Sequence, residues 1–160
     1  MAMFNVGDKV VYPMHGAGVI EAVEEREILG EKQKYYILRI PNGDMRVMVP
    51  LESAEEVGLR GVIDKEDVQK VYDVLAGDRT KMSSNWNRRY RANLEKIRTG
   101  DVFEVAEVVR NLTYREREKG LSTGERRMLE NAMQILISEL VIAEDSHVED
   151  VEKAIEEALQ

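Results

Sequence analysis

The spacing of the apolar residues changes once along this chain, and that change limits the folds it can adopt. Up to about Leu51, apolar residues alternate with polar ones in short runs, which is the period of β-strands. After Leu51 they recur every three or four residues, which is the period of amphipathic helices. Strands followed by helices favour an α+β arrangement. The sequence therefore predicts an α+β multidomain fold, with a small β-barrel first and an all-α helical bundle after it.

Four or five short strands are expected in the N-terminal part. The clearest runs cover residues 9–12, 19–28, 35–40 and 45–50. In the last run, Arg46 and Met48 lie on the face opposite the other apolar residues. Turns are expected at residues 16–18 and 41–44, the second of which contains the Asn-Gly pair that favours hairpins. So short a sheet has to curl to enclose a core, which predicts a barrel over residues 1–57 and a linker over residues 58–63.

The remaining residues, 64–160, are predicted to form the helical domain. The helical pattern covers residues 64–76, 86–98, 101–119 and 122–143, and a last acidic helix begins at about residue 146. Each start has a side chain that can accept a hydrogen bond from the free N–H groups of a first turn, namely Asp64, Ser84 or Asn85, Asp101, Ser122 and Ser146. Ser122 and Ser146 are each followed three residues later by glutamate, which is the capping-box pattern.

Composition argues against several classes of function. The chain has no cysteine, so disulfides, cysteine-ligated metals and thiol nucleophiles are absent. Its two histidines lie far apart, and Gly16-Ala17-Gly18 precedes a strand and lacks the lysine of a phosphate-binding loop. We therefore expect no enzyme, no cofactor and no metal. With no apolar run of about 20 residues and no signal peptide at the start, we also expect a cytoplasmic protein without membrane contact.

The net charge of −8 hides a strong segregation of charge. Residues 79–98 contain seven basic residues and one acid, whereas residues 144–157 contain seven acids and one base. A basic block within an acidic chain indicates an anionic partner more strongly than the total charge argues against one.

The stretch 85–93 combines the only tryptophan, Trp86, with three arginines at the start of a predicted helix. On a helical wheel, Arg88 and Arg91 fall to one side of the apolar face and Arg89 falls on the opposite side. Helix N-termini and guanidinium groups both suit phosphate, and an indole can stack on a base or wedge beside it. The alternative is that Trp86 packs into the helical core and the arginines form a solvated face. Both interpretations stay open on the residues alone.

Other candidate contact residues lie outside this stretch. Arg115 and Arg126 flank the helix break at Gly120 and could extend the basic surface, whereas Arg117 and Lys119 fit intrahelical ion pairs better. In the β part, the face with Arg46 and Met48 and the segment 24–27 are exposed candidates. An edge strand there could extend the sheet of a partner, or it could be a solvated edge guarded by charge.

Three motifs in order along the chain resemble a known family. VGDKVVYPMHG at residues 6–16, followed by Val49-Pro50, resembles the barrel of the CarD/CdnL family. NWNRRYRAN at residues 85–93 and REKGLSTGE at residues 117–125 resemble the helical domain of that family. The similarity extends over about residues 4–143. The barrel is shared with transcription-repair coupling factors, but this chain has no motor domains.

The resemblance implies a bacterial, non-enzymatic transcription regulator. In that family, a Tudor/SH3-like barrel binds the β subunit of RNA polymerase. The helical domain contacts promoter DNA at the upstream edge of the transcription bubble, where a tryptophan matched by Trp86 wedges into the minor groove and hinders bubble collapse. We expect weak sequence specificity, a monomer, and association with the nucleoid through RNA polymerase. A protein adaptor on polymerase that does not bind DNA is the alternative.

The family also suggests which residues make the contacts. Its DNA-contacting basic positions match Arg88, Arg91, Arg115 and Arg126, and a polymerase-contacting arginine matches Arg26. A basic residue is common in the family where this chain has Met48, but Arg46 lies two residues away on the same strand face. The candidate DNA-binding residues are Trp86, Arg88, Arg89, Arg91, Arg115 and Arg126. The candidate polymerase-binding residues are Arg26, Arg46 and Met48.

Overall fold

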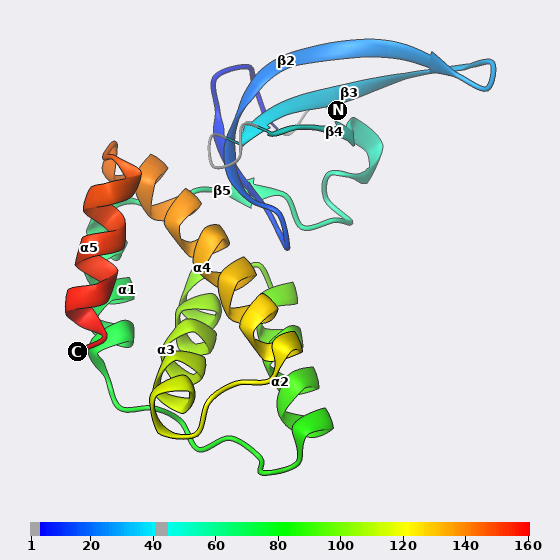
Figure 1. Cartoon of the computed structure of the whole chain (residues 1–160). Coiled ribbons are helices and arrows are strands. Elements are labelled where there is room, and N and C mark those ends of the chain that lie inside the picture. The colour runs from blue at the N-terminus through cyan, green and yellow to red at the C-terminus, as the bar shows by residue number, and fades with distance from the viewer. Residues whose placement is uncertain (1–3, 41–44) are drawn as a thin grey trace.

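A computed structural model describes residues 4–40 and 45–160, and it places a β domain on one side of the molecule and a helical domain on the other (Figure 1). The strands are β1 (Lys9–Tyr12), β2 (Gly16–Ile28), β3 (Glu31–Ile40), β4 (Met45–Pro50) and β5 (Arg60–Gly61). They form one antiparallel sheet in the order β4-β3-β2-β1-β5, and a short 3-10 helix, η1 (Leu51–Ser53), follows β4. The predicted α+β fold with a β domain before a helical domain is confirmed.

The core of the β domain lies against one face of this sheet. Its members are Val10, Ile20, Tyr36, Leu38, Val49, Ala54 and Leu59. The pairing register between β2 and β3 shifts by one residue between Ile20 and Ala22, and such a bulge bends a strand and increases its twist. The sheet can therefore curl around this small core.

The predicted turn at residues 16–18 is wrong, because these residues begin β2. The turn lies just before them, where Tyr12 pairs with Gly16 and Met14 has a positive φ of 74°. Gly18 instead lies where the backbones of β2 and β3 approach closely: a Cβ there would be 2.4 Å from the Arg39 carbonyl oxygen. Glycine marks this close approach and not a turn. The predicted turn at residues 41–44 lies outside the described residues.

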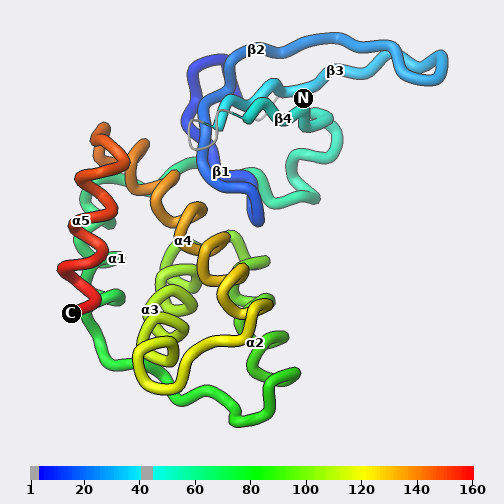
Figure 2. Tube along the Cα trace, viewed as in Figure 1, coloured from blue at the N-terminus to red at the C-terminus, as the bar shows by residue number. Residues whose placement is uncertain are grey.

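β2 and β3 continue beyond the end of β4 as a two-stranded arm that reaches away from the helices (Figures 1 and 2). At its tip Ile28 pairs with Glu31, and the two intervening residues, Leu29 and Gly30, both have positive φ, at 54° and 81°. A two-residue turn of this kind matches the twist of the flanking strands. The Leu29 side chain is 99% exposed, so the arm presents an apolar tip.

The helical domain contains α1 (Lys65–Ala76), α2 (Trp86–Arg98), α3 (Val102–Glu118), α4 (Thr123–Glu144) and α5 (Val148–Ala158). Asn85, Asp101 and Ser122 cap their helices as predicted, each accepting a hydrogen bond from a first-turn N–H. Asp64 is the N-cap of α1, but its side chain does not make the predicted capping hydrogen bond. The capping box predicted at Ser146 is wrong. His147 is the N-cap of α5 and its side chain makes no capping hydrogen bond. No helix in the described residues is long and apolar enough to cross a membrane.

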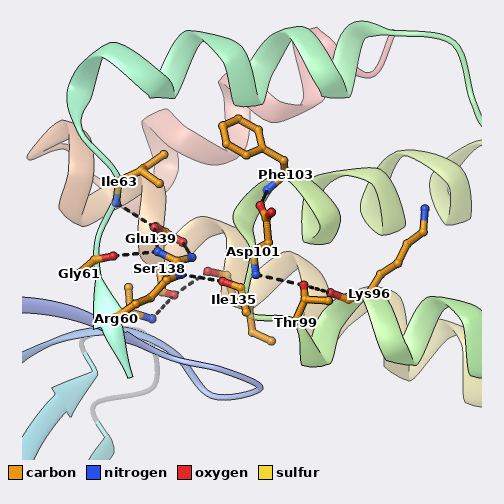
Figure 3. A network of polar contacts seen from close by, with 12 residues as sticks. Arg60, Gly61, Ile63, Lys96, Thr99, Asp101, Phe103, Ile135, Ser138 and Glu139 are labelled. Atoms are coloured by element: carbon orange, nitrogen blue, oxygen red, sulfur yellow. Dashed lines mark hydrogen bonds and ion pairs between the residues drawn. The ribbon is translucent and has the colours of Figure 1, made fainter. Parts of the chain in front are cut away.

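Residues 58–63, predicted as a linker, contain β5 and a polar anchor between the two domains. Arg60 pairs with Glu139 of α4 through Nη2–Oε1 and Nη1–Oε2 contacts of 2.7 and 2.8 Å, and its Nε donates to the Gly100 carbonyl at 2.8 Å (Figure 3). The Ile63 N–H donates to the same buried Glu139 carboxylate. Beside this pair, Ser138 Oγ accepts a hydrogen bond from the Ala17 N–H at 2.8 Å.

An apolar contact between the domains lies next to this anchor. Val11 and Ala17 of the sheet form a buried cluster with Ile142 of α4, with Val62 packed against it. Because a partly buried ion pair, a hydrogen bond from the Ala17 backbone and an apolar cluster all join the sheet to α4, the fold sets the position of the helical domain relative to the β domain.

Candidate nucleic-acid interface

Trp86 is the first residue of α2, and its indole contacts Ser122, Tyr90 and Gly124. Its Nε1 donates a hydrogen bond to Ser122 Oγ at 2.9 Å, and its ring stacks on Tyr90 one turn further along α2, with centroids 4.9 Å apart and 17° between planes. A Cβ at Gly124 would be 3.5 Å from the indole, so α4 begins in direct contact with it. The residue is nevertheless 41% exposed. The indole is therefore oriented by its neighbours and still reaches solvent, so Trp86 is not sealed in the helical core.

The prediction that Arg89 contacts DNA is contradicted by its burial. Arg89 is 4% exposed, and its Nε and Nη2 donate to the two carboxylate oxygens of Glu125, which is 2% exposed, at 2.7 and 3.1 Å. Its Nη1 donates to the Ser83 carbonyl at 3.1 Å. Arg89 does lie opposite Arg88 and Arg91, as the helical wheel predicts, but that side packs against the start of α4. Its charge is matched by Glu125 and does not face a phosphate.

The two partners perturb each other's titration. Hydrogen bonding to Glu125 raises the pKa of the Arg89 guanidinium despite its burial. Burial by itself would raise the pKa of the Glu125 carboxyl, but hydrogen bonds and charge from Arg89, together with hydrogen bonds from Ser122, lower it below its usual range. Both groups are therefore charged at neutral pH, and each neutralises the buried charge of the other.

Ser122 joins this buried pair to the exposed indole. Its hydroxyl accepts hydrogen bonds from Trp86 Nε1 and from the Glu125 N–H, and it donates to Glu125 Oε1 at 3.2 Å. One polar chain thus runs from Trp86 through Ser122 and Glu125 to Arg89. The sequence predicts only the capping role of Ser122, because Trp86 and Ser122 are 36 residues apart and no local spacing relates them.

The other predicted DNA-binding arginines are accessible to different degrees. Arg88 and Arg91 are exposed, and their side chains form no ion pair or hydrogen bond with any described residue. Arg126 is also exposed, although it lies 3.5 Å from the Glu116 carboxylate. Arg115 is partly buried, and its Nε has no hydrogen-bond partner within the described residues. Arg115 lines a cleft together with Ser83 and Ser84, which belong to the loop that leads into Trp86.

The three predicted polymerase-binding residues share one face of the sheet. In the strand register, Met48 lies opposite Ile37 and Arg46 lies opposite Arg39. Arg26 lies opposite Gln33, which is separated from Ile37 and Arg39 by an even number of positions on β3. Because side chains alternate between faces, Arg26, Arg46 and Met48 all point away from the β-domain core. All three are exposed; Arg26 pairs with Glu24 at 2.7 Å and Arg46 with Glu21 at 3.2 Å.

The acidic C-terminal helix does not cover the basic surface. α5 packs on α1 and α4, at the opposite side of the helical domain from the start of α2 (Figure 1). Among the described residues, no three histidine, cysteine, aspartate or glutamate side chains gather as a metal site would require.

Comparison with known proteins assigns both domains. Residues 4–63 match the CarD-like/TRCF RID domain, and residues 70–156 match the CarD C-terminal domain. A β domain of the polymerase-interacting kind joined to this helical domain defines a class of non-catalytic transcription factors. The chain therefore belongs to the CarD/CdnL family of transcription factors, which interact with RNA polymerase.

A relative from Bacillus subtilis agrees with the family assignment. The chain is 43% identical over 140 residues to the "Putative transcription factor YdeB" of Bacillus subtilis (strain 168), covering 88% of this chain and 92% of that protein. Two solved N-terminal domains from Myxococcus xanthus, of CdnL and of CarD, are 41% and 31% identical. They cover 39% and 38% of this chain and 89% and 81% of their own, with TM-scores of 0.34 and 0.33.

Proposed function

We propose that this protein stabilises the open promoter complex of bacterial RNA polymerase. In this proposal the β domain binds the polymerase β subunit through the face with Arg26, Arg46 and Met48. The helical domain then places Trp86 against the upstream edge of the transcription bubble, in the minor groove, where the indole hinders re-pairing of the strands.

The observation that carries the proposal is the state of the indole: 41% exposed, yet fixed by Ser122 and stacked on Tyr90. A side chain that wedges between bases loses conformational entropy on binding, and pre-orientation reduces that loss. A tryptophan with a purely structural role would gain more stability from complete burial.

Charge supports the same role. Arg88 and Arg91 are exposed on α2 beside Trp86, and Arg126 lies in the first turn of α4, which also contacts the indole. Arg115 adds a cation next to the loop before Trp86. Arginine contacts to phosphate provide affinity without reading sequence, so binding should depend strongly on salt and weakly on promoter sequence.

The contacts between the two domains support the proposed action of Trp86. Binding of the β domain to polymerase would raise the local concentration of the helical domain at the promoter, so weak DNA affinity would be sufficient. A rigid joint would also direct the indole to one position on the DNA. The Arg60–Glu139 pair and the Ala17–Ser138 hydrogen bond provide such a joint.

The test is the lifetime of the open complex after addition of a competitor, with polymerase saturated by wild-type protein or by Trp86→Ala. The wild type should lengthen the lifetime and Trp86→Ala should not, while Arg26→Glu should act at the earlier step by weakening binding to the β subunit. An unchanged lifetime with Trp86→Ala and normal polymerase binding would refute the wedge. Absence of any DNA footprint with polymerase bound would instead favour a protein adaptor.

A further inference from the structure

A basic cleft lies between the loop that joins α1 to α2 and the C-terminal end of α3, next to the start of α2. Its volume is about 770 Å³. The loop contributes Arg79, Thr80, Lys81, Met82, Ser83 and Ser84, and α3 and its end contribute Asn111, Arg115, Glu118 and Lys119. The family resemblance points only to Arg115 in this set, so the cleft as a whole has no assigned role.

Buried polar side chains hold the loop side of this cleft in place. Arg110 donates to the Val74 carbonyl and to Thr80 Oγ1, each at 3.0 Å, and the Thr80 N–H donates to Asn111 Oδ1 at 3.0 Å. At the other end of the loop, Arg89 donates to the Ser83 carbonyl at 3.1 Å. The loop has no helix or strand, yet it is tied to α2 and α3 along its length. The cleft is therefore preformed.

The charge of the cleft is strongly positive within a protein of net charge −8. Four cations, Arg79, Lys81, Arg115 and Lys119, face it with a single carboxylate, Glu118, which forms an ion pair with Arg79. Lys81 and Lys119 are exposed and form no ion pair with any described residue. Like charges gathered in one concave site repel one another, which favours binding of an anion there.

One cation also lacks a partner that the fold could have provided. Arg115 Nε is buried, and it makes no hydrogen bond within residues 4–40 and 45–160. A buried donor without an acceptor costs free energy, and the Arg115 guanidinium also forms no ion pair with any described residue. Hydroxyl groups of Thr80, Ser83 and Ser84 line the same cleft. Guanidinium, ammonium and hydroxyl donors together match the oxygens of phosphate groups.

We propose that this cleft binds phosphate groups and that Lys81 and Lys119 are contact residues. The backbone of a DNA strand passing Trp86 and a free nucleoside polyphosphate share this chemistry. The DNA source rests on the proposed function, because Ser83 and Ser84 line the cleft and lie within three residues of Trp86. In that case the cleft holds the strand on one side of the wedge while Arg88 and Arg91 hold it on the other.

The experiment compares Lys81→Gln/Lys119→Gln with a matched control, Lys65→Gln/Lys153→Gln. Both pairs remove two exposed lysines, and the control pair lies on α1 and α5, away from the cleft. Affinity for a fluorescent forked DNA is measured between about 50 and 200 mM salt, and inorganic tripolyphosphate is titrated in a separate arm. Loss of two phosphate contacts lowers the salt slope by about 2, so wild type should lose about tenfold more affinity than the cleft variant over this range.

Each outcome bears on the proposal. A reduced slope for the cleft pair alone supports the DNA backbone as the source. One-to-one tripolyphosphate binding that only the cleft pair loses, with unchanged DNA slopes, supports a free phosphorylated ligand. Equal behaviour of the two pairs in both arms, or no binding by wild type in either, overturns the proposal. Trp86→Ala should keep the wild-type salt slope because the indole is uncharged, so failure of the wedge and failure of the cleft are distinguishable.

Discussion

Replacing Glu125 with glutamine should destabilise the helical domain far more than so small a change of shape suggests. The Glu125 carboxylate accepts hydrogen bonds from Arg89 Nε and Nη2, at 2.7 and 3.1 Å, in a site where Glu125 is 2% exposed and Arg89 is 4% exposed. In Glu125→Gln the guanidinium stays buried with only the Ser83 and Ser84 carbonyls near its Nη1, at 3.1 and 3.4 Å. A full charge is then left without a counterion.

The expected cost is large on the scale of domain stability. Removing one partner of a buried pair costs about 3–5 kcal/mol, and a domain of this size is stable by only about 5–15 kcal/mol. With a urea dependence of about 2 kcal/mol per molar, the unfolding midpoint should fall by about 2 M. The double variant Arg89→Met/Glu125→Leu should recover much of this loss, because no charge remains buried.

The assay combines a local and a global probe. Trp86 is the only tryptophan and contacts Ser122, so its fluorescence reports on this site, while far-ultraviolet circular dichroism reports on all helices. Arg91→Met, at an exposed position on the same helix, is the control and should change stability by less than about 0.5 kcal/mol. A cost below about 1 kcal/mol for Glu125→Gln, or a double variant as unstable as the sum of the single ones, would refute the reasoning.

The same pair predicts a pH dependence of definite sign. Because the fold lowers the pKa of Glu125, its contribution to stability is fully present above the ordinary glutamate pKa and is lost as the pH falls through the lowered value. The free energy of unfolding of the wild type, measured in urea, should therefore decrease in acid. In Glu125→Gln the part of this decrease that comes from protonation of Glu125 should be absent. Parallel pH profiles of the two proteins would contradict this assignment.

Three further predictions concern the rest of the fold. Arg60→Met should cost about 3 kcal/mol, seen in thermal unfolding, because it leaves the buried Glu139 charge without its partner; a near-neutral result would contradict the proposed joint. Gly16→Ala should cost about 1–3 kcal/mol, because φ is +113° and the new Cβ would lie 2.7 Å from Ser138 Oγ, whereas Gly61→Ala, with open space around its Cβ, is the control. Tyr72→Phe should cost about 1 kcal/mol through the lost hydrogen bond to Glu144. Burial together with Glu144 raises the pKa of Tyr72, so an absorbance titration of the wild type should show one tyrosine that ionises at a higher pH than the others and that is missing in Tyr72→Phe.

Local hydrogen bonding explains which helix starts were predictable. Asn85, Asp101 and Ser122 cap helices through contacts with residues two or three positions away, which a sequence pattern records. Ser146 has the same pattern but α5 starts one residue later at His147, because Ser146 instead closes the end of α4 with a backbone hydrogen bond to Val141. Two overlapping local signals compete there, and the C-terminal turn of α4 takes precedence.

Long-range contacts explain what the sequence could not provide. Arg89 belongs to a visibly basic stretch, and only its contact with Glu125, 36 residues away, shows that its charge is buried. Residues 31–34 are polar and lack a strand pattern, yet pairing with β2 extends β3 through them. The candidate site was thus predictable as a tryptophan among arginines, and Tyr90 lies one turn further along the same helix. The hydrogen bond from Trp86 to Ser122, in contrast, required the packing of α2 against α4.

The most direct test of the wedge is the rate at which the upstream edge of the bubble closes. A 2-aminopurine placed at that edge changes fluorescence on re-pairing, and the rate is measured by stopped flow after competitor addition with polymerase saturated by protein. Stacking on an aromatic side chain contributes about 1–3 kcal/mol, so Trp86→Ala should speed closure about 5- to 150-fold relative to wild type. Equal closure rates, at equal occupancy of polymerase, would contradict the account.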